Sequence, residues 1–241
     1  MNAFIQALCQ SQPAIAVPLT AADGAALLRE VDAVCQSKAQ IAEWRLDAWP
    51  TVPDNIAQLV MKRLREADKL VLLTVRTHAE GGAFSGSVAD YVTLYRRMLA
   101  VGPDAIDVEA SVPPVSRKAL VKRAHEQQCV VVGSHHDFKR TPNFEAAQAL
   151  LQSQSLWADV VKLAAMPQVP ADTLNLLATS AWAHDHITQP AIVIGMGALG
   201  QLTRVATGAF ASALTFATLD RASAPGQLSV ETILTLQEAM A

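Results

Sequence analysis

Short apolar runs alternate with segments of helical periodicity along the whole chain. Eight such runs occupy residues 14–18, 41–46, 70–75, 105–108, 130–133, 159–163, 191–196 and 213–217. Parallel strands need a crossover, usually a helix, so the alternation predicts parallel βαβ units. An open doubly wound sheet shares this alternation, but eight repeats within 241 residues fit a barrel better. We therefore predict a single-domain α/β protein, a (β/α)8 TIM barrel over residues 1–241, with residues 1–13 as a candidate cap.

Capping signals indicate where several helices begin. Ser87 and Asp90 have capping-box spacing, in which a hydroxyl and a carboxylate each satisfy a free backbone N–H. Thr20 and Asp23 repeat that spacing, and Thr141 precedes a proline suited to a first helical turn. We expect helices to start at these three places.

The composition narrows the function classes. The chain is 51% hydrophobic and 17% charged, which supplies a large core and argues against disorder. A net charge of -3 argues against a nucleic-acid-binding surface. The first dozen residues lack the features of a signal peptide, and no apolar stretch is long enough for a membrane span. Three widely spaced cysteines indicate reduced thiols. We expect a cytoplasmic protein without nucleic-acid or membrane partners.

Ionisable residues gather at the C-terminal ends of the apolar runs. They occur at six of the eight runs: Glu43 and Arg45, Arg76, Asp107 and Glu109, His135 and His136, Lys162, and Arg204. Residues two apart on a strand share a face. In a barrel these positions converge on the C-terminal mouth, where active sites of this architecture lie. Charged residues at one strand end would be ordinary residues of the barrel rim, whereas charged residues at six of the eight strand ends predict a functional site.

Lys162 is the most informative of these residues, because it interrupts an apolar run where an unpaired ammonium is costly to bury. One interpretation is a structural lysine paired with Asp107 or Glu109 inside the barrel. The other is a nucleophilic amine, since desolvation and neighbouring cations favour its uncharged form. The run alone leaves both open.

His135 and His136 are adjacent, so on an extended chain their side chains point apart. Without HExxH or a Cys/His cluster, they predict no metal site. They are either capping or surface imidazoles, or one of them moves protons during imine chemistry at a lysine on the next strand. Residues 195–200 match a Gly-rich pattern but lack the GK[ST] ending and the acidic residue of a dinucleotide site. We expect no cofactor.

Seven motifs occur in order from about residue 14 to the C-terminus. They are Glu43-Trp-Arg45, Val75-Arg76 with Glu80-Gly-Gly82, Ile106-Asp-Val-Glu109, Ser134-His-His-Asp-Phe138, Lys162-Leu-Ala-Ala-Met-Pro-Gln168, Arg204, and Ser223-Ala-Pro-Gly-Gln227. Their combination resembles the type I 3-dehydroquinate dehydratase family. The resemblance implies a barrel lyase, commonly dimeric, that converts 3-dehydroquinate to 3-dehydroshikimate in the shikimate pathway. It implies a small-molecule substrate, a homodimer, and no metal or cofactor.

The resemblance also implies a role for each site residue. Lys162 matches the imine-forming lysine, His136 the proton-transferring histidine, and Glu80 a carboxylate near that histidine. The substrate-binding positions match Glu43, Arg45, Arg76, Arg204, Ser223 and Gln227. Two positions depart from the pattern, because His135 stands where relatives often carry Asn and Pro18 where some carry Ser.

Two other functions fit parts of the same pattern. A class I aldolase shares the barrel and the lysine, but it cleaves a C–C bond and usually grips a phosphate, for which no convincing loop is present. A non-catalytic carboxylate-binding protein would keep Lys162 as a buried ion-pair member. Trapping an imine with borohydride separates the binding protein from both enzymes.

Overall fold

Eight parallel strands form the centre of the molecule, in the order β7-β6-β5-β4-β3-β2-β1-β8. The computed structural model describes residues 2–206, 210, 212–220 and 223–240. The strands are β1 Ala14–Leu19, β2 Ile41–Arg45, β3 Leu70–Thr74, β4 Ala105–Glu109, β5 Val130–Asp137, β6 Val160–Ala165, β7 Ala191–Gly195 and β8 Leu214–Phe216. At the seam, the backbone N–H of Ala213 donates to the carbonyl of Ala191 at 2.8 Å, so the sheet curls into a nearly closed barrel.

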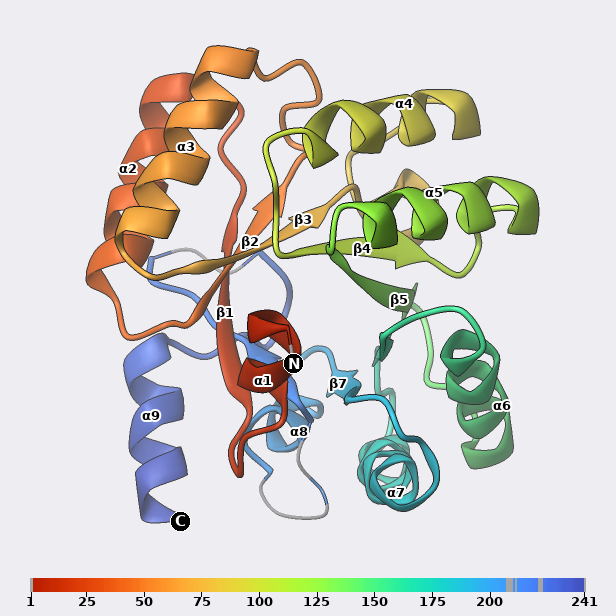
Figure 1. The fold of residues 1–241 in the computed structure, drawn as a ribbon. Coiled ribbons are helices and arrows are strands. Elements are labelled where there is room, and N and C mark those ends of the chain that lie inside the picture. Colours follow the sequence, from red (N-terminus) through yellow and green to blue (C-terminus); the bar gives the residue numbers. More distant parts are fainter. Residues whose placement is uncertain (1, 207–209, 211, 221–222, 241) are drawn as a thin grey trace.

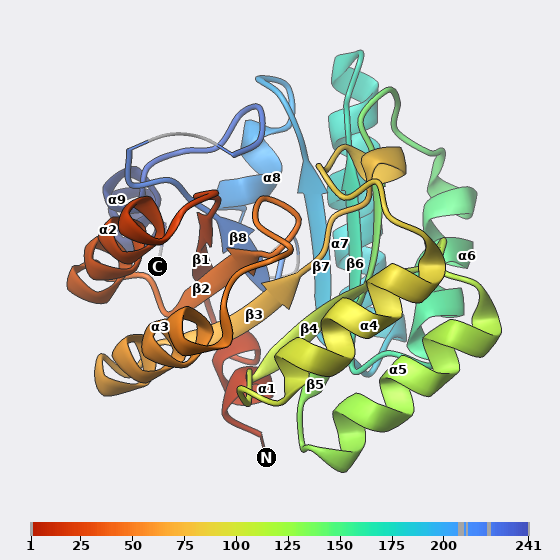
Figure 2. The same cartoon turned by 90° about the horizontal axis from the view of Figure 1, so that it is seen from above.

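Helices cover the outside of the strands (Figures 1 and 2). The helical elements of the described residues are α1 Ala3–Leu8, α2 Gly24–Gln36, α3 Asp54–Glu66, the 3-10 turn η1 His78–Glu80, α4 Val88–Leu99, α5 Pro114–Glu126, α6 Phe144–Ser155, α7 Pro170–His186, α8 Gln201–Val205 and α9 Val230–Ala239. The predicted single-domain (β/α)8 barrel is confirmed, and the alternative prediction, an open doubly wound sheet, is wrong. Within the described ranges, no helix has the length and apolar character needed to cross a membrane.

The helix starts agree with the capping signals at one of three places. Ser87 caps α4 in the predicted capping box. Helix α2 is capped by Asp23 rather than Thr20, and α6 by Asn143 rather than Thr141. In both wrong cases a carboxylate or amide oxygen lies directly before the helix, where it reaches the N3 backbone N–H, and it replaces the more distant hydroxyl.

The inward-facing residues change from apolar to ionisable along the strands. In β2, Ile41 belongs to the apolar cluster of the interior, whereas Glu43 two residues later is a buried acid. In β6, Val160 and Lys162 repeat the change. Because residues two apart share a face, the barrel has an apolar half at its N-terminal end and a charged half at its mouth.

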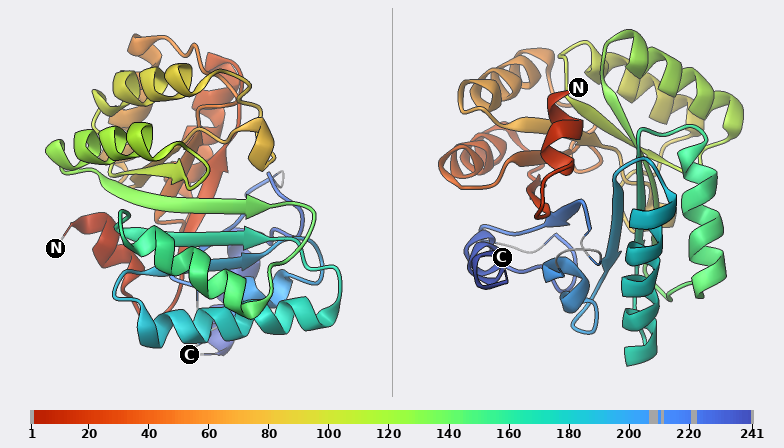
Figure 3. Two further views of the ribbon diagram at one scale, coloured as in Figure 1. Left: turned by 90° about the vertical axis from the view of Figure 1, so that its right-hand side faces the viewer. Right: turned by 60° about the horizontal axis from the view of Figure 1, so that its bottom comes forward.

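Helix α1 lies across the N-terminal end of the strands (Figure 3). Its residues Phe4 and Leu8 are buried and belong to the interior cluster with Ala16 and Ile41. The apolar half of the barrel is therefore packed against α1, and the site described next lies at the opposite end.

Candidate active site

One cavity at the C-terminal mouth collects the predicted site residues. All of them except Glu80 line it: Glu43, Arg45, Arg76, His136, Lys162, Arg204, Ser223 and Gln227. Apolar side chains complete the wall, among them Phe138, Ile194, Met196 and Phe216. The cavity thus combines cations, one imidazole and apolar surface, which suits a small polar molecule with a hydrocarbon frame.

Lys162 lies on β6 opposite Ser134 of β5, with 3% of its surface exposed. Its Nζ is 3.0 Å from Oδ2 of Asp107 and 4.5 Å from the centroid of the Phe216 ring. Burial favours the protonated acid, but Arg76 and Lys162 lower the pKa of Asp107 to about 2. Asp107 is therefore an ionised partner for the lysine, as the structural interpretation of Lys162 expects.

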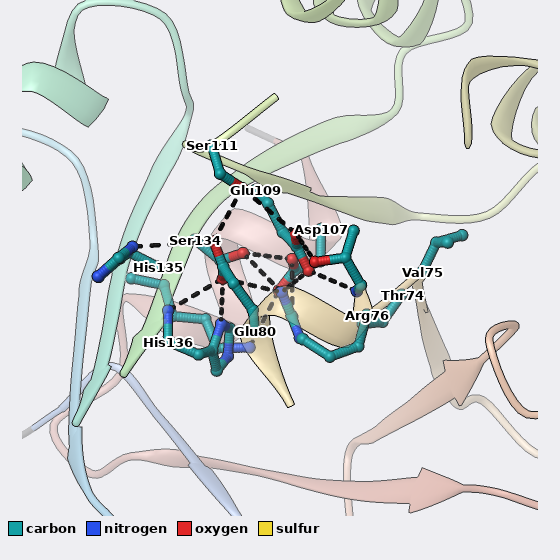
Figure 4. A network of polar contacts seen from close by, with 12 residues as sticks. Thr74, Val75, Arg76, Glu80, Asp107, Glu109, Ser111, Ser134, His135 and His136 are labelled. Carbon is teal, nitrogen blue, oxygen red and sulfur yellow. Dashed lines mark hydrogen bonds and ion pairs between the residues drawn. The ribbon is translucent and has the colours of Figure 1, made fainter. Parts of the chain in front are cut away.

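Arg76 connects the carboxylates of the mouth (Figure 4). Its guanidinium pairs with Asp107 at 2.9 Å, with Glu109 at 2.8 Å and with Glu80 at 3.6 Å. Burial alone would lower the pKa of Arg76, but these carboxylates raise it. Although the residue lines the cavity, most of its guanidinium is engaged by the protein itself.

His136 lines the cavity and is paired with the buried Glu80, which does not line it (Figure 4). Oε2 of Glu80 is 3.0 Å from Nδ1 of His136 and accepts its backbone N–H, while Oε1 accepts the Ser111 hydroxyl. Burial and nearby Glu109 raise the pKa of Glu80 to about 7. Burial, together with the charges of Arg76 and Lys162, holds the pKa of His136 well below its usual value. The imidazole is therefore neutral near pH 7.

His135 occupies a different position from its neighbour. Its side chain is 37% exposed, its Nδ1 is 3.8 Å from Oε1 of Glu80, and it is not among the residues that line the cavity. Strand β5 continues to Asp137, so His135 and His136 alternate faces. The structure brings His136, and not His135, to the place where a molecule can bind.

Arg204 on α8 is buried without a carboxylate partner in the described residues, and its surface is 2% exposed. Its Nη1 and Nη2 donate to the carbonyls of Phe216 and Pro225 at 3.4 Å, and Nε has no hydrogen-bond partner there. Burial lowers the pKa of Arg204 to about 10. A buried guanidinium of this kind is a site for an anion supplied from outside.

Ser223 and Gln227 stand together at the rim. The Gln227 amide nitrogen donates to the Ser223 hydroxyl at 3.0 Å, and its Oε1 accepts the Ser223 backbone N–H at 2.7 Å. On β2, Glu43 accepts the Thr74 hydroxyl at 3.0 Å. These groups offer both donors and acceptors to a hydroxylated ligand.

Asp47 does not line the cavity but holds Arg45, which does, and it was not predicted from the sequence. Its carboxylate binds the Arg45 guanidinium through two hydrogen bonds, of 2.8 and 2.7 Å. It lies two residues beyond Arg45, just outside the apolar run. Following the period of two past the end of the run is the signal that would have found it.

The fold and the site together define the class of protein, a (β/α)8-barrel enzyme with a buried lysine in its mouth. The model of the type I 3-dehydroquinase family matches residues 15–241. The chain belongs to this family, which catalyses the dehydration step of the shikimate pathway.

Relatives of known name agree with this assignment. A 3-dehydroquinate dehydratase of Enterococcus faecalis is 37% identical, over 93% of this chain and 91% of its own length. One of Lactiplantibacillus plantarum is 38% identical, over 92% and 90%. A solved type I 3-dehydroquinate dehydratase from Clostridium difficile, with covalently modified comenic acid, has a TM-score of 0.89 at 31% identity, covering 96% of this chain and 93% of that one.

Proposed function

We propose that this protein converts 3-dehydroquinate to 3-dehydroshikimate by syn elimination through a Schiff base on Lys162, with His136 as general acid and base. The observation that carries the proposal is a buried primary amine on the wall of the same cavity as a neutral imidazole. The covalently modified ligand in the Clostridium difficile relative supports a covalent step. The Lys162–Asp107 pair also fits a structural lysine, and trapping of the imine distinguishes the two roles.

Imine formation comes first in the proposed sequence. His136 takes a proton from the Lys162 ammonium, and the free amine attacks the C3 ketone. The resulting carbinolamine loses its hydroxyl as water with a proton returned by His136, which leaves a protonated imine. Asp107, 3.0 Å from Nζ in the resting protein, provides a negative charge beside that cation.

Elimination follows because the protonated imine is an electron sink. His136 takes a C2 proton, and the electron pair flows into the imine to give an enamine. The enamine then expels the C1 hydroxyl, which receives the proton from His136 and leaves as water. Hydrolysis of the conjugated imine releases 3-dehydroshikimate and restores Lys162.

Glu80 positions His136 in this scheme. When Glu80 is ionised it accepts a hydrogen bond from Nδ1–H of His136, so the imidazole presents unprotonated Nε2 as the base. The second hydrogen bond, from the His136 backbone N–H, fixes the position of the Glu80 carboxylate relative to the His136 ring. Glu80 does not line the cavity, and its role is exerted through the histidine.

The remaining residues hold the substrate. Arg204 binds its carboxylate, since a guanidinium fork matches that group and Arg204 has no described carboxylate of its own. Ring hydroxyls are held by the other rim residues, Glu43, Arg45, Arg76, Ser223 and Gln227. Such a site rejects analogues that lack a hydroxyl, because its own polar groups would be left unpaired.

Family membership supports three further parts of the proposal: the protein works as a homodimer, in the cytoplasm, without metal or cofactor. Light scattering at several concentrations tests the dimer. A molecular mass equal to one chain at all of them would contradict it.

The function is tested by incubating the protein with 3-dehydroquinate and following the products by NMR. Dehydration gives one product with the full carbon skeleton and a new conjugated double bond. An aldolase would give two shorter fragments, and a carboxylate-binding protein would return the substrate unchanged.

A further inference from the structure

Asp47 lies two residues after the end of strand β2, between Arg45 and the loop that follows β3. It is 4% exposed, and its carboxylate receives four hydrogen bonds. Two come from Nε and Nη2 of Arg45 at 2.8 and 2.7 Å. The others come from the backbone N–H groups of Arg76 at 3.2 Å and Ala83 at 3.0 Å.

The two-point contact fixes the plane of the Arg45 guanidinium. An arginine held through Nε and Nη2 by a carboxylate cannot turn without breaking both bonds. The remaining nitrogen, Nη1, is not used by Asp47. Since Arg45 lines the cavity, this arrangement leaves Nη1 as the group available to a ligand.

The same carboxylate anchors the loop after β3. Asp47 binds the N–H of Arg76 at its start and of Ala83 near its end. The loop is closed by the N–H of Phe84, which donates to the carbonyl of Arg76 at 3.1 Å. Glu80, the partner of His136, lies within this loop. Asp47 therefore binds both Arg45, which lines the cavity, and the loop whose Glu80 orients the His136 imidazole.

We propose that Asp47 is a positioning residue, which holds the Arg45 guanidinium in the orientation needed to donate to a ring hydroxyl of the substrate. This inference rests on the proposed function. The charge of Asp47 suits the task, because hydrogen bonds from Arg45 outweigh the effect of burial and keep the pKa of Asp47 below its usual value.

Asp47→Asn is a demanding substitution although it preserves shape. All four partners of the carboxylate are N–H donors, and an amide nitrogen accepts none of them. The variant must therefore lose the hydrogen bonds to whichever carboxylate oxygen is replaced by the amide nitrogen. A matched control is Asp54→Asn, since the Asp54 side chain is 74% exposed and reaches its arginine only at 3.6 Å.

The test measures KM and kcat for 3-dehydroquinate in Asp47→Asn, Arg45→Ala, the double variant and Asp54→Asn. We expect Asp47→Asn to raise KM at least tenfold, with kcat lowered less than threefold. In the Arg45→Ala background the same change should raise KM less than twofold, and Asp54→Asn should match the wild type. If Asp47→Asn does not fold, Asp47→Glu replaces it, with a raised KM expected because the longer side chain displaces Arg45.

Each failure has a distinct meaning. A wild-type KM in the folded Asp47 variant, beside a raised KM in Arg45→Ala, overturns the role of Asp47 and leaves the contact of Arg45 with substrate standing. An equal rise in KM with and without Arg45 also overturns it, because Asp47 would then act only through the loop. A wild-type KM in Arg45→Ala refutes the proposed hydroxyl contact itself.

Discussion

Arg204 shows at the scale of one residue how a binding site is prepared before a ligand arrives. Its buried guanidinium has an unpartnered Nε and no carboxylate partner among the residues described. Arg204→Ala should raise KM, since a lost charged hydrogen bond costs about 1.5–3 kcal/mol, or ~10–100-fold in binding. Circular dichroism should show an unchanged fold. A wild-type KM in steady-state kinetics would exclude Arg204 as the carboxylate anchor.

The two adjacent histidines give a second residue-scale prediction. General acid–base assistance is worth ~10²–10⁴-fold, so His136→Ala should lower kcat by at least ~10²-fold. His135→Asn should be mild, because His135 does not line the cavity. Measuring kcat for both variants decides between them, and a crippled His135→Asn beside an active His136→Ala would refute the assignment.

Glu80 makes stability depend on pH in a direction that can be measured. Its pKa is about 7 in the folded protein, above its ordinary value of 4.5, so the folded state holds this proton more tightly. The free energy of unfolding should fall as pH rises from about 4.5 through 7, by up to about 3 kcal/mol. The lowered pKa of His136 acts in the opposite sense, in both wild type and variant.

Glu80→Gln cannot titrate and removes this contribution. Urea unfolding at about pH 5 and pH 8 compares the two proteins. The wild type should lose more stability than Glu80→Gln between these values, and an equal change in both would show that Glu80 ionises normally.

Which residues meet at the mouth could be predicted, because a period of two and parallel strands bring Glu43, Asp107 and Lys162 to one end of the barrel. The ion-pair partner of each residue could not be predicted. Whether Lys162 meets Asp107 or Glu109 depends on side-chain conformation across strands, and the structure selects Asp107 at 3.0 Å. The engagement of Arg76 by three carboxylates has the same origin.

At the scale of elements, the apolar runs gave strand positions to within a few residues. The largest difference is β5, predicted over residues 130–133 and observed over Val130–Asp137. The extension is polar, and it exists because His135, His136 and Asp137 pair with Leu163, Ala164 and Ala165 of β6. Apolar periodicity cannot detect a strand segment that is held by its neighbour and faces a polar cavity.

The prediction at the scale of elements concerns the contribution of helix α1 to stability. We propose that it caps the barrel, since Phe4 is fully buried in the interior cluster. Phe4→Ala should lower the free energy of unfolding by about 3–5 kcal/mol and leave KM unchanged, because the site lies at the other end. Leu156→Ala, at a residue 86% exposed, is the control. Denaturant unfolding and kinetics on both variants check this; a stable Phe4→Ala would contradict the cap.

At the scale of the whole molecule, the barrel separates packing from chemistry. Apolar residues fill the end covered by α1, and ionisable residues occupy the mouth. The fold itself is shared with the Clostridium difficile relative, which has a TM-score of 0.89 although only 31% of residues are identical. The fold therefore tolerates extensive substitution.

The central claim is that Lys162 forms the imine, and reductive trapping tests it most directly. The protein is mixed with 3-dehydroquinate, reduced with borohydride, and analysed by intact-mass and peptide mass spectrometry beside Lys162→Ala. We predict a stable mass gain on the peptide containing Lys162, and none in the variant, which should also have no turnover. A mass gain that persists in Lys162→Ala, or a wild-type protein that turns over substrate without any trapped adduct, would contradict the account.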